Sequence, residues 1–264
     1  SEFPSNFFKN ITSRRASIGS LNFLRAEIMG IVNLTPDSFS DGGVIKNVKD
    51  FSCKIDYLIS EGAKIVDIGG ESTKPGSSEV SYDIEKDRIF ECLKFLSETN
   101  RDVVISIDTR KSMIAEIAAK LKVHMVNDVS AGTFDGKMFD VIKKYNLSVC
   151  LCHSLGVPKT MNVNPKYDNV VLDVYDQLEE KINNAINVGI SKDKILVDPG
   201  IGFGKTGAHN LDLIRNISIF HGLGCAIVLG VSRKKFIRTT TISNSESDLK
   251  IGSVFYSLEG VRQG

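Results

Sequence analysis

Short apolar segments alternate with longer amphipathic segments along most of the chain. From residue 26 onward, each apolar run is followed by a polar or glycine-rich turn and then by a stretch with helical periodicity. Apolar runs this short and this rich in Ile and Val are typical of strands buried on both faces. The predicted strands are Ile28–Val32, Lys64–Ile68, Val103–Ile107, His124–Val126, Ser148–Leu151, Lys194–Val197 and Cys225–Leu229. The predicted helices are Val48–Glu61, Tyr82–Ser97, Ser112–Leu121, Gly136–Tyr145, Asn169–Val188, Asn210–Phe220 and Leu249–Val261.

This alternation predicts a parallel sheet, because strands joined through helices must cross over between neighbours. The length of 264 residues suits a (β/α)8 TIM barrel, which needs about 250 residues. The pattern alone does not separate a closed barrel from an open doubly wound sheet. Seven strands are found and no eighth follows them, so we expect a (β/α)8 barrel without its eighth strand and helix.

The first residues break the pattern. Residues 1–20 show no periodicity and contain Ser, Asn and paired Arg, so we expect them to lie outside the fold. Residues 1–25 are interpreted as a linker or cloning remnant, and residues 26–264 as one barrel domain.

Composition narrows the classes of function. The 33 Lys and Arg nearly balance the 32 Asp and Glu, which argues against nucleic acid or an anionic membrane as a partner. No apolar run reaches the roughly 20 residues of a membrane span. Five cysteines without CxxC spacing indicate free thiols in a reducing compartment, so we expect a cytoplasmic protein.

Polar residues gather where the predicted strands end. In a parallel barrel these ends converge on one rim, where active sites of this architecture are built. A single Asp after a strand is more often a turn former or helix cap, but here polar groups follow every predicted strand. The set is Asn33, Glu71, Asp108, Asn127, Asp128, His153, Asp198, Ser232, Arg233 and Lys234.

Three further segments need an interpretation. The loop Pro36–Gly43 is long and ends in two glycines, which favours a mobile lid. Gly200–Thr206 resembles a P-loop, but only three residues separate its first glycine from the Gly-Lys-Thr triplet, and a P-loop requires four. Cys150-Leu-Cys-His153 suggests a metal site, yet alternation places both cysteines on one strand face and His153 on the other, which favours buried thiols.

Six motifs occur in order at the strand ends. They are Asn33-Leu-Thr-Pro-Asp-Ser-Phe-Ser-Asp-Gly-Gly43, Asp67-Ile-Gly-Gly-Glu-Ser-Thr-Lys-Pro-Gly76, Ile107-Asp-Thr-Arg110, Val126-Asn-Asp-Val-Ser-Ala-Gly132, Asp198-Pro-Gly-Ile-Gly-Phe-Gly-Lys205 and Gly230-Val-Ser-Arg-Lys-Lys-Phe236. Together they resemble the dihydropteroate synthases, from about residue 26 to the end of the chain. The resemblance implies a transferase of folate biosynthesis, which joins (7,8-dihydropterin-6-yl)methyl diphosphate to p-aminobenzoate and releases pyrophosphate.

The resemblance also assigns roles to residues. It implies that Asp108, Asn127 and Asp198 bind the aminopyrimidinone edge of the pterin, and that Lys234 binds a ring acceptor. Lys234, Asp108 and Asp198 are then the candidate catalytic residues, together with Asp41 on the long loop. It places Asn33 as a ligand of Mg²⁺, which suits oxygen donors and phosphate.

The p-aminobenzoate site follows from the same resemblance. Its carboxylate is expected to meet Lys234, Lys235 and the N-terminus of the helix that follows. Sulfonamides, which mimic p-aminobenzoate, should bind there too. The remaining positions implied for this pocket and its loops are Phe39, Thr73, Lys74, Pro75, Phe203, Ser232 and Arg233. A homodimer is also implied, and an upstream folate-pathway domain is a possible fusion partner.

The chain departs from the family pattern at four places. Lys74 stands where Arg is usual, Cys152 where Met is common, and Lys235 where many bacterial members have Ser. The Arg-x-His motif of the family's eighth strand is not found. Two alternatives therefore stay open: a methyltetrahydrofolate-binding barrel of the corrinoid methyltransferases, and a pterin-binding barrel without catalysis.

Overall fold

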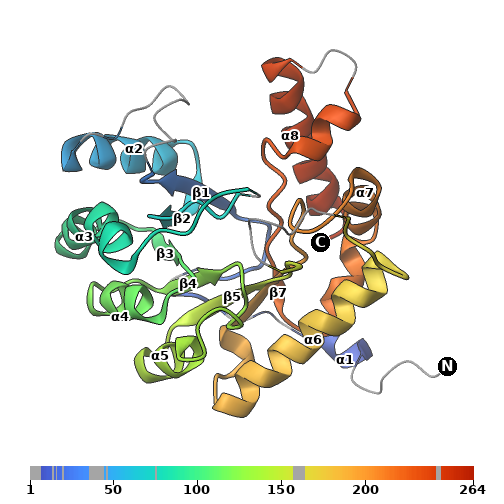
Figure 1. Cartoon of the computed structure of the whole chain (residues 1–264), viewed down its shortest axis with the longest axis horizontal. Coiled ribbons are helices and arrows are strands. Elements are labelled where there is room, and N and C mark those ends of the chain that lie inside the picture. The colour runs from blue at the N-terminus through green and yellow to red at the C-terminus, as the bar shows by residue number, and fades with distance from the viewer. Residues whose placement is uncertain are drawn as a thin grey trace.

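The chain folds into a curled parallel sheet surrounded by helices, as a computed structural model shows (Figure 1). The structure describes residues 7–264 except 14, 16, 20, 36–44, 46, 75, 157–163 and 242–244. Seven strands lie side by side in chain order, all parallel. They are β1(Ile28–Asn33), β2(Ala63–Gly69), β3(Val104–Asp108), β4(Met125–Asp128), β5(Ser148–Cys152), β6(Ile195–Asp198) and β7(Ala226–Ile227). The predicted α/β architecture of barrel type is confirmed.

Helices connect the strands and cover the outside of the sheet (Figure 1). The α-helices between or after strands are α2(Val48–Ser60), α3(Tyr82–Glu98), α4(Ser112–Lys120), α5(Met138–Tyr145), α6(Val170–Val188), α7(Gly207–Arg215) and α8(Glu246–Arg262). Polar caps fix several of their starts: the side chains of Asn47, Ser81 and Asn169 each accept a backbone N–H in the first turn of α2, α3 and α6.

The predicted helix Asn210–Phe220 is wrong in its second half. The α-helix ends at Arg215, and a 3-10 helix η3(Ile217–Leu223) follows. Its buried side chains Ile217, Phe220 and Leu223 recur every third residue, which is the period of a 3-10 helix rather than an α-helix.

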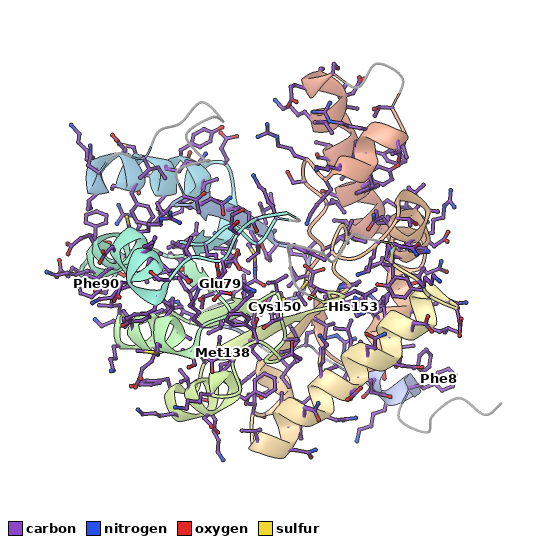
Figure 2. All side chains as sticks on the ribbon, in the orientation of Figure 1. Phe8, Glu79, Phe90, Met138, Cys150 and His153 are labelled. Atoms are coloured by element: carbon purple, nitrogen blue, oxygen red, sulfur yellow. The ribbon has the colours of Figure 1, made fainter. Side chains whose placement is uncertain are left out.

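Two apolar cores lie on the two faces of the sheet. The larger core fills the space between the sheet and the outer helices, and includes Val66, Ile107 and Leu151 from the strands. The smaller core fills the inside of the curled sheet. It consists of Ile18, Ile65, Val104, Met125, Cys150 and Leu196, and Figure 2 shows Cys150 near the centre of the molecule.

The expectation that residues 1–20 lie outside the fold is wrong for the described part of this segment, which begins at Phe7. Helix α1(Phe7–Thr12) packs against η3, and Asn10 Nδ2 donates to the Gly222 carbonyl at 2.8 Å. Ile18 is only 2% exposed, because it closes the inner core at the N-terminal ends of the strands. Periodicity missed this segment because single apolar side chains anchor it, not a continuous amphipathic face.

The two edges of the sheet are β1 and β7. Within the described residues, β1 pairs only with β2 and β7 only with β6, and no eighth strand lies between them. The helix predicted at Leu249–Val261 is confirmed as α8, although Phe255 and Leu258 on it are exposed. No helix in the described ranges is long and apolar enough to span a membrane.

Candidate active site

Three candidate residues lie in one row that crosses four strands. The strand register pairs Asn33 with Gly69, Gly69 with Asp108, and Asp108 with Asn127. Gly69 leaves a gap in this row, since a Cβ there would lie 3.5 Å from Asn33 Oδ1 and 3.4 Å from Asp108 Oδ2. The row therefore brings an amide, a carboxylate and a second amide to the C-terminal rim of the sheet.

Alternation along the strands sorts the inward-facing side chains into layers. Ile65 on β2 and Val104 on β3 belong to the inner apolar core. Two residues further along, Asp67 and Ser106 face the same side, and two further again Asp108 reaches the rim. The candidate site thus lies above a layer of polar side chains, Asp67 and Ser106, and this layer packs on the inner apolar core.

The rim groups keep unused capacity to accept hydrogen bonds. Among the described residues, none donates a hydrogen bond to the Asp108 carboxylate or to Asn127 Oδ1. The other end of the Asn127 amide is occupied, since Nδ2 donates to Asp67 Oδ2 at 2.8 Å. Asp198 accepts the Gly200 N–H with Oδ1 at 2.7 Å, while its Oδ2 lies 3.7 Å from the position of a Cβ on Gly230. Three acceptors from three strands are therefore available to a ligand that carries a row of donors.

Lys234 supplies the positive charge of the site. Its Nζ lies 4.0 Å from the centre of the Phe203 ring, so two residues that the sequence assigned to one site are in contact. Burial lowers the pKa of Lys234, whereas the charges of Asp198 and Asp108 raise it. The lysine therefore lies within electrostatic reach of both carboxylates.

The surroundings of the two rim carboxylates disfavour their ionised forms. Burial, followed by repulsion from Asp67 and Glu85, raises the pKa of Asp108 well above its ordinary value. Burial also raises the pKa of Asp198, and the Gly200 N–H and Lys234 oppose that rise. A ligand that donates hydrogen bonds to these groups would favour their ionised form.

A buried lysine in the turn after β6, which contacts the residue that follows β5, was missed by sequence reasoning. Lys205 Nζ donates to His153 Nδ1 at 2.9 Å and to the Phe203 carbonyl at 3.0 Å. His153 Nδ1 must accept, so its Nε2–H donates to Gln177 Oε1 at 3.1 Å. Burial lowers the pKa of Lys205 to about 7 and that of His153 to about 2.

This lysine holds the turn that carries Phe203. The turn passes so close to β5 that a Cβ on Gly200, whose φ is +71°, would lie 1.8 Å from the His153 carbonyl oxygen. Only glycine fits there. The signal in the sequence was the Gly-x-Gly-x-Gly-Lys run itself, which indicates a tight turn with a lysine inside it.

A second network, also missed, anchors the loop after β2. Glu71 is buried and accepts the Val80 N–H at 2.9 Å, so it closes the loop that carries Thr73 and Lys74. It also binds Arg110 at 3.1 Å and Lys111 at 3.0 Å. Although burial raises the pKa of Glu71, these partners lower it overall.

Thr73 is half-buried and Lys74 is exposed on this anchored loop. The charge of Lys74 lowers the pKa of Lys234, so the two lysines face the same region. Pro75 of the same loop lies outside the described residues, as do Phe39, Asp41 and the whole predicted lid Pro36–Gly43.

The turn after β7 only partly matches the sequence prediction. Ser232, Arg233 and Lys235 are all exposed. Arg233 pairs with Glu246 of α8 at 3.3 Å. The helix expected to bind a carboxylate at its N-terminus is the short 3-10 segment η4(Lys235–Thr239). A single turn of this kind has a weaker dipole than an α-helix, and its contact with the p-aminobenzoate carboxylate stays a prediction.

The cysteine interpretation agrees with the structure. All five cysteines are free, and Cys150 and Cys152 are buried on the inner side of β5 while His153 turns towards α6. No group of three or more His, Cys, Asp or Glu that could hold a metal occurs in the described part of the chain.

A cavity of about 400 Å³ lies at the opposite end of the sheet. Its lining includes Asn10, Ile18, Lys192 and Cys225, which surround the N-terminal ends of the last strands. The polar rim residues do not contribute to it. We therefore assign the candidate site to the C-terminal rim.

A curled parallel sheet with half-buried carboxylates, an amide and a lysine converging on one rim is the arrangement of an α/β-barrel enzyme. The sequence profile of the pterin binding enzyme family matches residues 29–264. The dihydropteroate synthase of Escherichia coli K12 is 39% identical over 83% of this chain and 77% of its own length.

Solved structures give the same result. Yersinia pestis dihydropteroate synthase, in complex with a sulfonamide drug, has a TM-score of 0.87 at 34% identity over 94% of this chain and 90% of its own. The Xanthomonas albilineans enzyme, with 4-aminobenzoic acid, has a TM-score of 0.86 at 35% identity over 96% and 90%. The chain belongs to the dihydropteroate synthase family of pterin-binding enzymes.

Proposed function

We propose that this protein condenses (7,8-dihydropterin-6-yl)methyl diphosphate with p-aminobenzoate to give 7,8-dihydropteroate and pyrophosphate. The observation that carries the proposal is the set of acceptors at Asp108, Asn127 Oδ1 and Asp198 Oδ2, which the described residues leave unpaired. The aminopyrimidinone edge of a pterin presents a row of N–H donors. The three acceptors are half-buried, and a ligand that covers them must donate to them, because an acceptor buried without a partner costs about 1–3 kcal/mol.

The reaction balances without a redox step. The arylamine nitrogen forms a bond to the exocyclic methylene carbon, the bond from that carbon to the diphosphate oxygen breaks, and the nitrogen loses a proton. The amine already has a free lone pair, so it needs position more than a general base. Positive charge that develops on the pterin methylene is stabilised by the nearby carboxylates of Asp108 and Asp198.

Lys234 is the residue that serves both substrates. Its ammonium lies over the Phe203 ring and near Asp198, at the boundary between the pterin edge and the space next to the Lys74 loop. There it donates to a ring acceptor and attracts the carboxylate of p-aminobenzoate, with Lys235 beside it. Thr73 and Phe203 are proposed as walls of that pocket, and sulfonamides are proposed to bind in it.

We propose that Mg²⁺ is held at Asn33. The oxygen of Asn33 and the carboxylate of Asp108 both border the gap over Gly69, and hard oxygen donors suit this ion. Magnesium commonly uses few protein ligands and completes its shell with substrate phosphates, so one amide oxygen with the diphosphate fits. When bound, it would neutralise charge on the leaving diphosphate. Asn33→Ala should raise the Mg²⁺ concentration needed for half-maximal turnover, and an unchanged requirement would remove Asn33 from this role.

The remaining expectations concern the assembly and its setting. A homodimer, a cytoplasmic location and an upstream folate-pathway domain stay proposals from the family resemblance. The free thiols, four of them buried, agree with a reducing compartment. Sedimentation at several protein concentrations would test the dimer.

The function is tested by incubating the protein with both substrates and Mg²⁺ and measuring pyrophosphate and 7,8-dihydropteroate together. Equal amounts of the two products are expected. Binding of the pterin without pyrophosphate would favour the non-catalytic barrel. Binding of methyltetrahydrofolate in preference to the dihydropterin would favour the corrinoid methyltransferase alternative.

A further inference from the structure

A carboxylate beneath the rim is used by none of the steps proposed above. Asp67 lies on β2 inside the curled sheet and is only 2% exposed. The strand register pairs it with Ser106 of β3, whose Oγ donates to Asp67 Oδ1 at 2.6 Å. Its other oxygen, Oδ2, accepts from Asn127 Nδ2 at 2.8 Å. A buried carboxylate that binds one rim residue directly needs an explanation.

The bond to Asn127 fixes which end of that amide reaches the rim. An Asn side chain carries an acceptor and a two-proton donor on the same carbon, so it presents opposite chemistry when it rotates by half a turn. With Nδ2 directed down to Asp67, Oδ1 is directed away from it. The flipped amide would place Oδ1 against a carboxylate oxygen, where two acceptors repel each other.

We propose that Asp67 is a positioning residue for the pterin site, which holds Asn127 so that its Oδ1, and not its Nδ2, faces the ligand. The inference rests on the proposed function, because it assumes that the ligand edge at Asn127 is a donor. Asp67 does not touch the ligand and positions the site through Asn127. It therefore sets the donor–acceptor pattern of the site from one layer below. Its charge also raises the pKa of Asp108, and both Asp67→Leu and Asp67→Asn remove that charge, so the comparison of these two variants isolates the bond to Asn127.

Ser106 completes the arrangement. Its hydroxyl can donate or accept, so the pair tolerates an amide in place of the carboxylate. In Asp67→Asn the new Nδ2 can donate to Ser106 Oγ while the new Oδ1 still accepts from Asn127. In Asp67→Leu nothing accepts from Asn127 Nδ2, and the amide is free to rotate.

The test is calorimetric binding of 6-hydroxymethyl-7,8-dihydropterin to folded variants. Asp67→Leu should bind about tenfold more weakly, the effect of losing one well-oriented hydrogen bond. Asp67→Asn should recover most of that loss. In turnover, Asp67→Leu should raise KM for the dihydropterin diphosphate and leave KM for p-aminobenzoate unchanged, whereas general damage to the barrel would raise both.

Cys150→Ala is the matched control. Cys150 belongs to the same inner core. Its backbone is the β5 partner of Asn127 in the sheet, but its side chain makes no hydrogen bond to the Asn127 amide, so shortening it leaves a cavity without removing a partner of that amide. It should lower the melting temperature without weakening pterin binding. If Asp67→Leu is folded and binds as tightly as the wild type, the proposal is overturned.

An exchange of the two side chains keeps the proposal testable if Asp67→Leu does not fold. Asn127→Asp alone places two carboxylates in contact and should weaken binding. Adding Asp67→Asn restores one donor and one acceptor with their roles exchanged, and a carboxylate oxygen still faces the ligand. The double variant should therefore bind more tightly than Asn127→Asp, and a double variant that is no better would sink the inference. A wild-type protein that does not bind this dihydropterin would instead overturn the proposed function.

Discussion

Replacing Asp108 by Asn should make the protein more stable and a poorer enzyme. In the wild type, burial and the neighbouring charges of Asp67 and Glu85 raise the pKa of Asp108 well above its ordinary value. No described residue donates a hydrogen bond that would stabilise its charge. At neutral pH the folded state must therefore either carry an unfavourable charge at Asp108 or take up a proton there, and both cost free energy. Asn has nearly the same volume and no charge, so it removes this cost without leaving a cavity.

The sign follows from linkage. A carboxyl with a raised pKa binds a proton more readily in the folded state than in the unfolded state. Its unfavourable contribution to the free energy of folding is therefore absent below the pKa of the unfolded state and grows as pH rises towards the pKa of the folded state. Asp108→Asn should match the wild type near pH 4. At pH 8 it should gain about 1 kcal/mol, the usual size of such functional trade-offs, or about 2–4 °C in melting temperature for a chain of this length.

Thermal melts of both proteins across this pH range provide the assay, with calorimetric pterin binding beside them. Pterin affinity should fall by about tenfold or more, because Asn cannot present two acceptors. A loss of stability in Asp108→Asn that is equal at both ends of the pH range would refute the electrostatic reasoning. Asp128 offers a control, since backbone and hydroxyl donors from Ser130 and Gly132 already satisfy its carboxylate, and Asp128→Asn should lose stability.

Three further predictions concern single residues. Lys234→Met should weaken dihydropterin binding by about 10–100-fold, the value of a charged hydrogen bond, and lower turnover with it; near-normal turnover in steady-state assays would remove Lys234 from the mechanism. The wild type should gain stability relative to Lys205→Met as pH rises from about 7 towards 10. The pKa of Lys205 in the folded state, about 7, lies below its pKa in the unfolded state, so protonation of this lysine opposes folding. A difference in unfolding free energy, measured in urea, that does not change with pH would contradict this. Ile18→Ala should cost about 2–5 kcal/mol in urea unfolding, and a negligible cost would show that the segment before β1 is not part of the inner core.

The sequence predicted the order and type of the strands because each strand core is a short run dominated by apolar residues, with only single polar residues such as Asp67 and Ser106 inside it. It placed most strand ends too early. Six of the seven strands continue for one or two residues past the predicted end, because the backbone ladder continues past the apolar run, and four of these extensions reach polar residues, among them Asp108 and Asp198. The polar site residues are thus held within the strands, which makes their positions more rigid than the sequence suggested.

The parts of the site that the sequence did not reveal are those that depend on pairing between distant elements. Asp67 appears in the sequence as one residue of a strand, and only the register of β2, β3 and β4 shows that it lies beneath Asn127. The contact of Lys205 with His153 joins residues 52 positions apart. The buried segment around Ile18 was overlooked because isolated anchors leave no periodic pattern.

The most direct measurement of the central claim is a crystal structure of this protein with 7,8-dihydropteroate bound. The account predicts the pterin edge against Asp108, Asn127 and Asp198, with Lys234 on a ring acceptor and the p-aminobenzoate portion beside Phe203. Asn127 should face the ring with its oxygen. A pterin bound elsewhere, for example in the 400 Å³ cavity next to Ile18 at the other end of the sheet, would contradict the account.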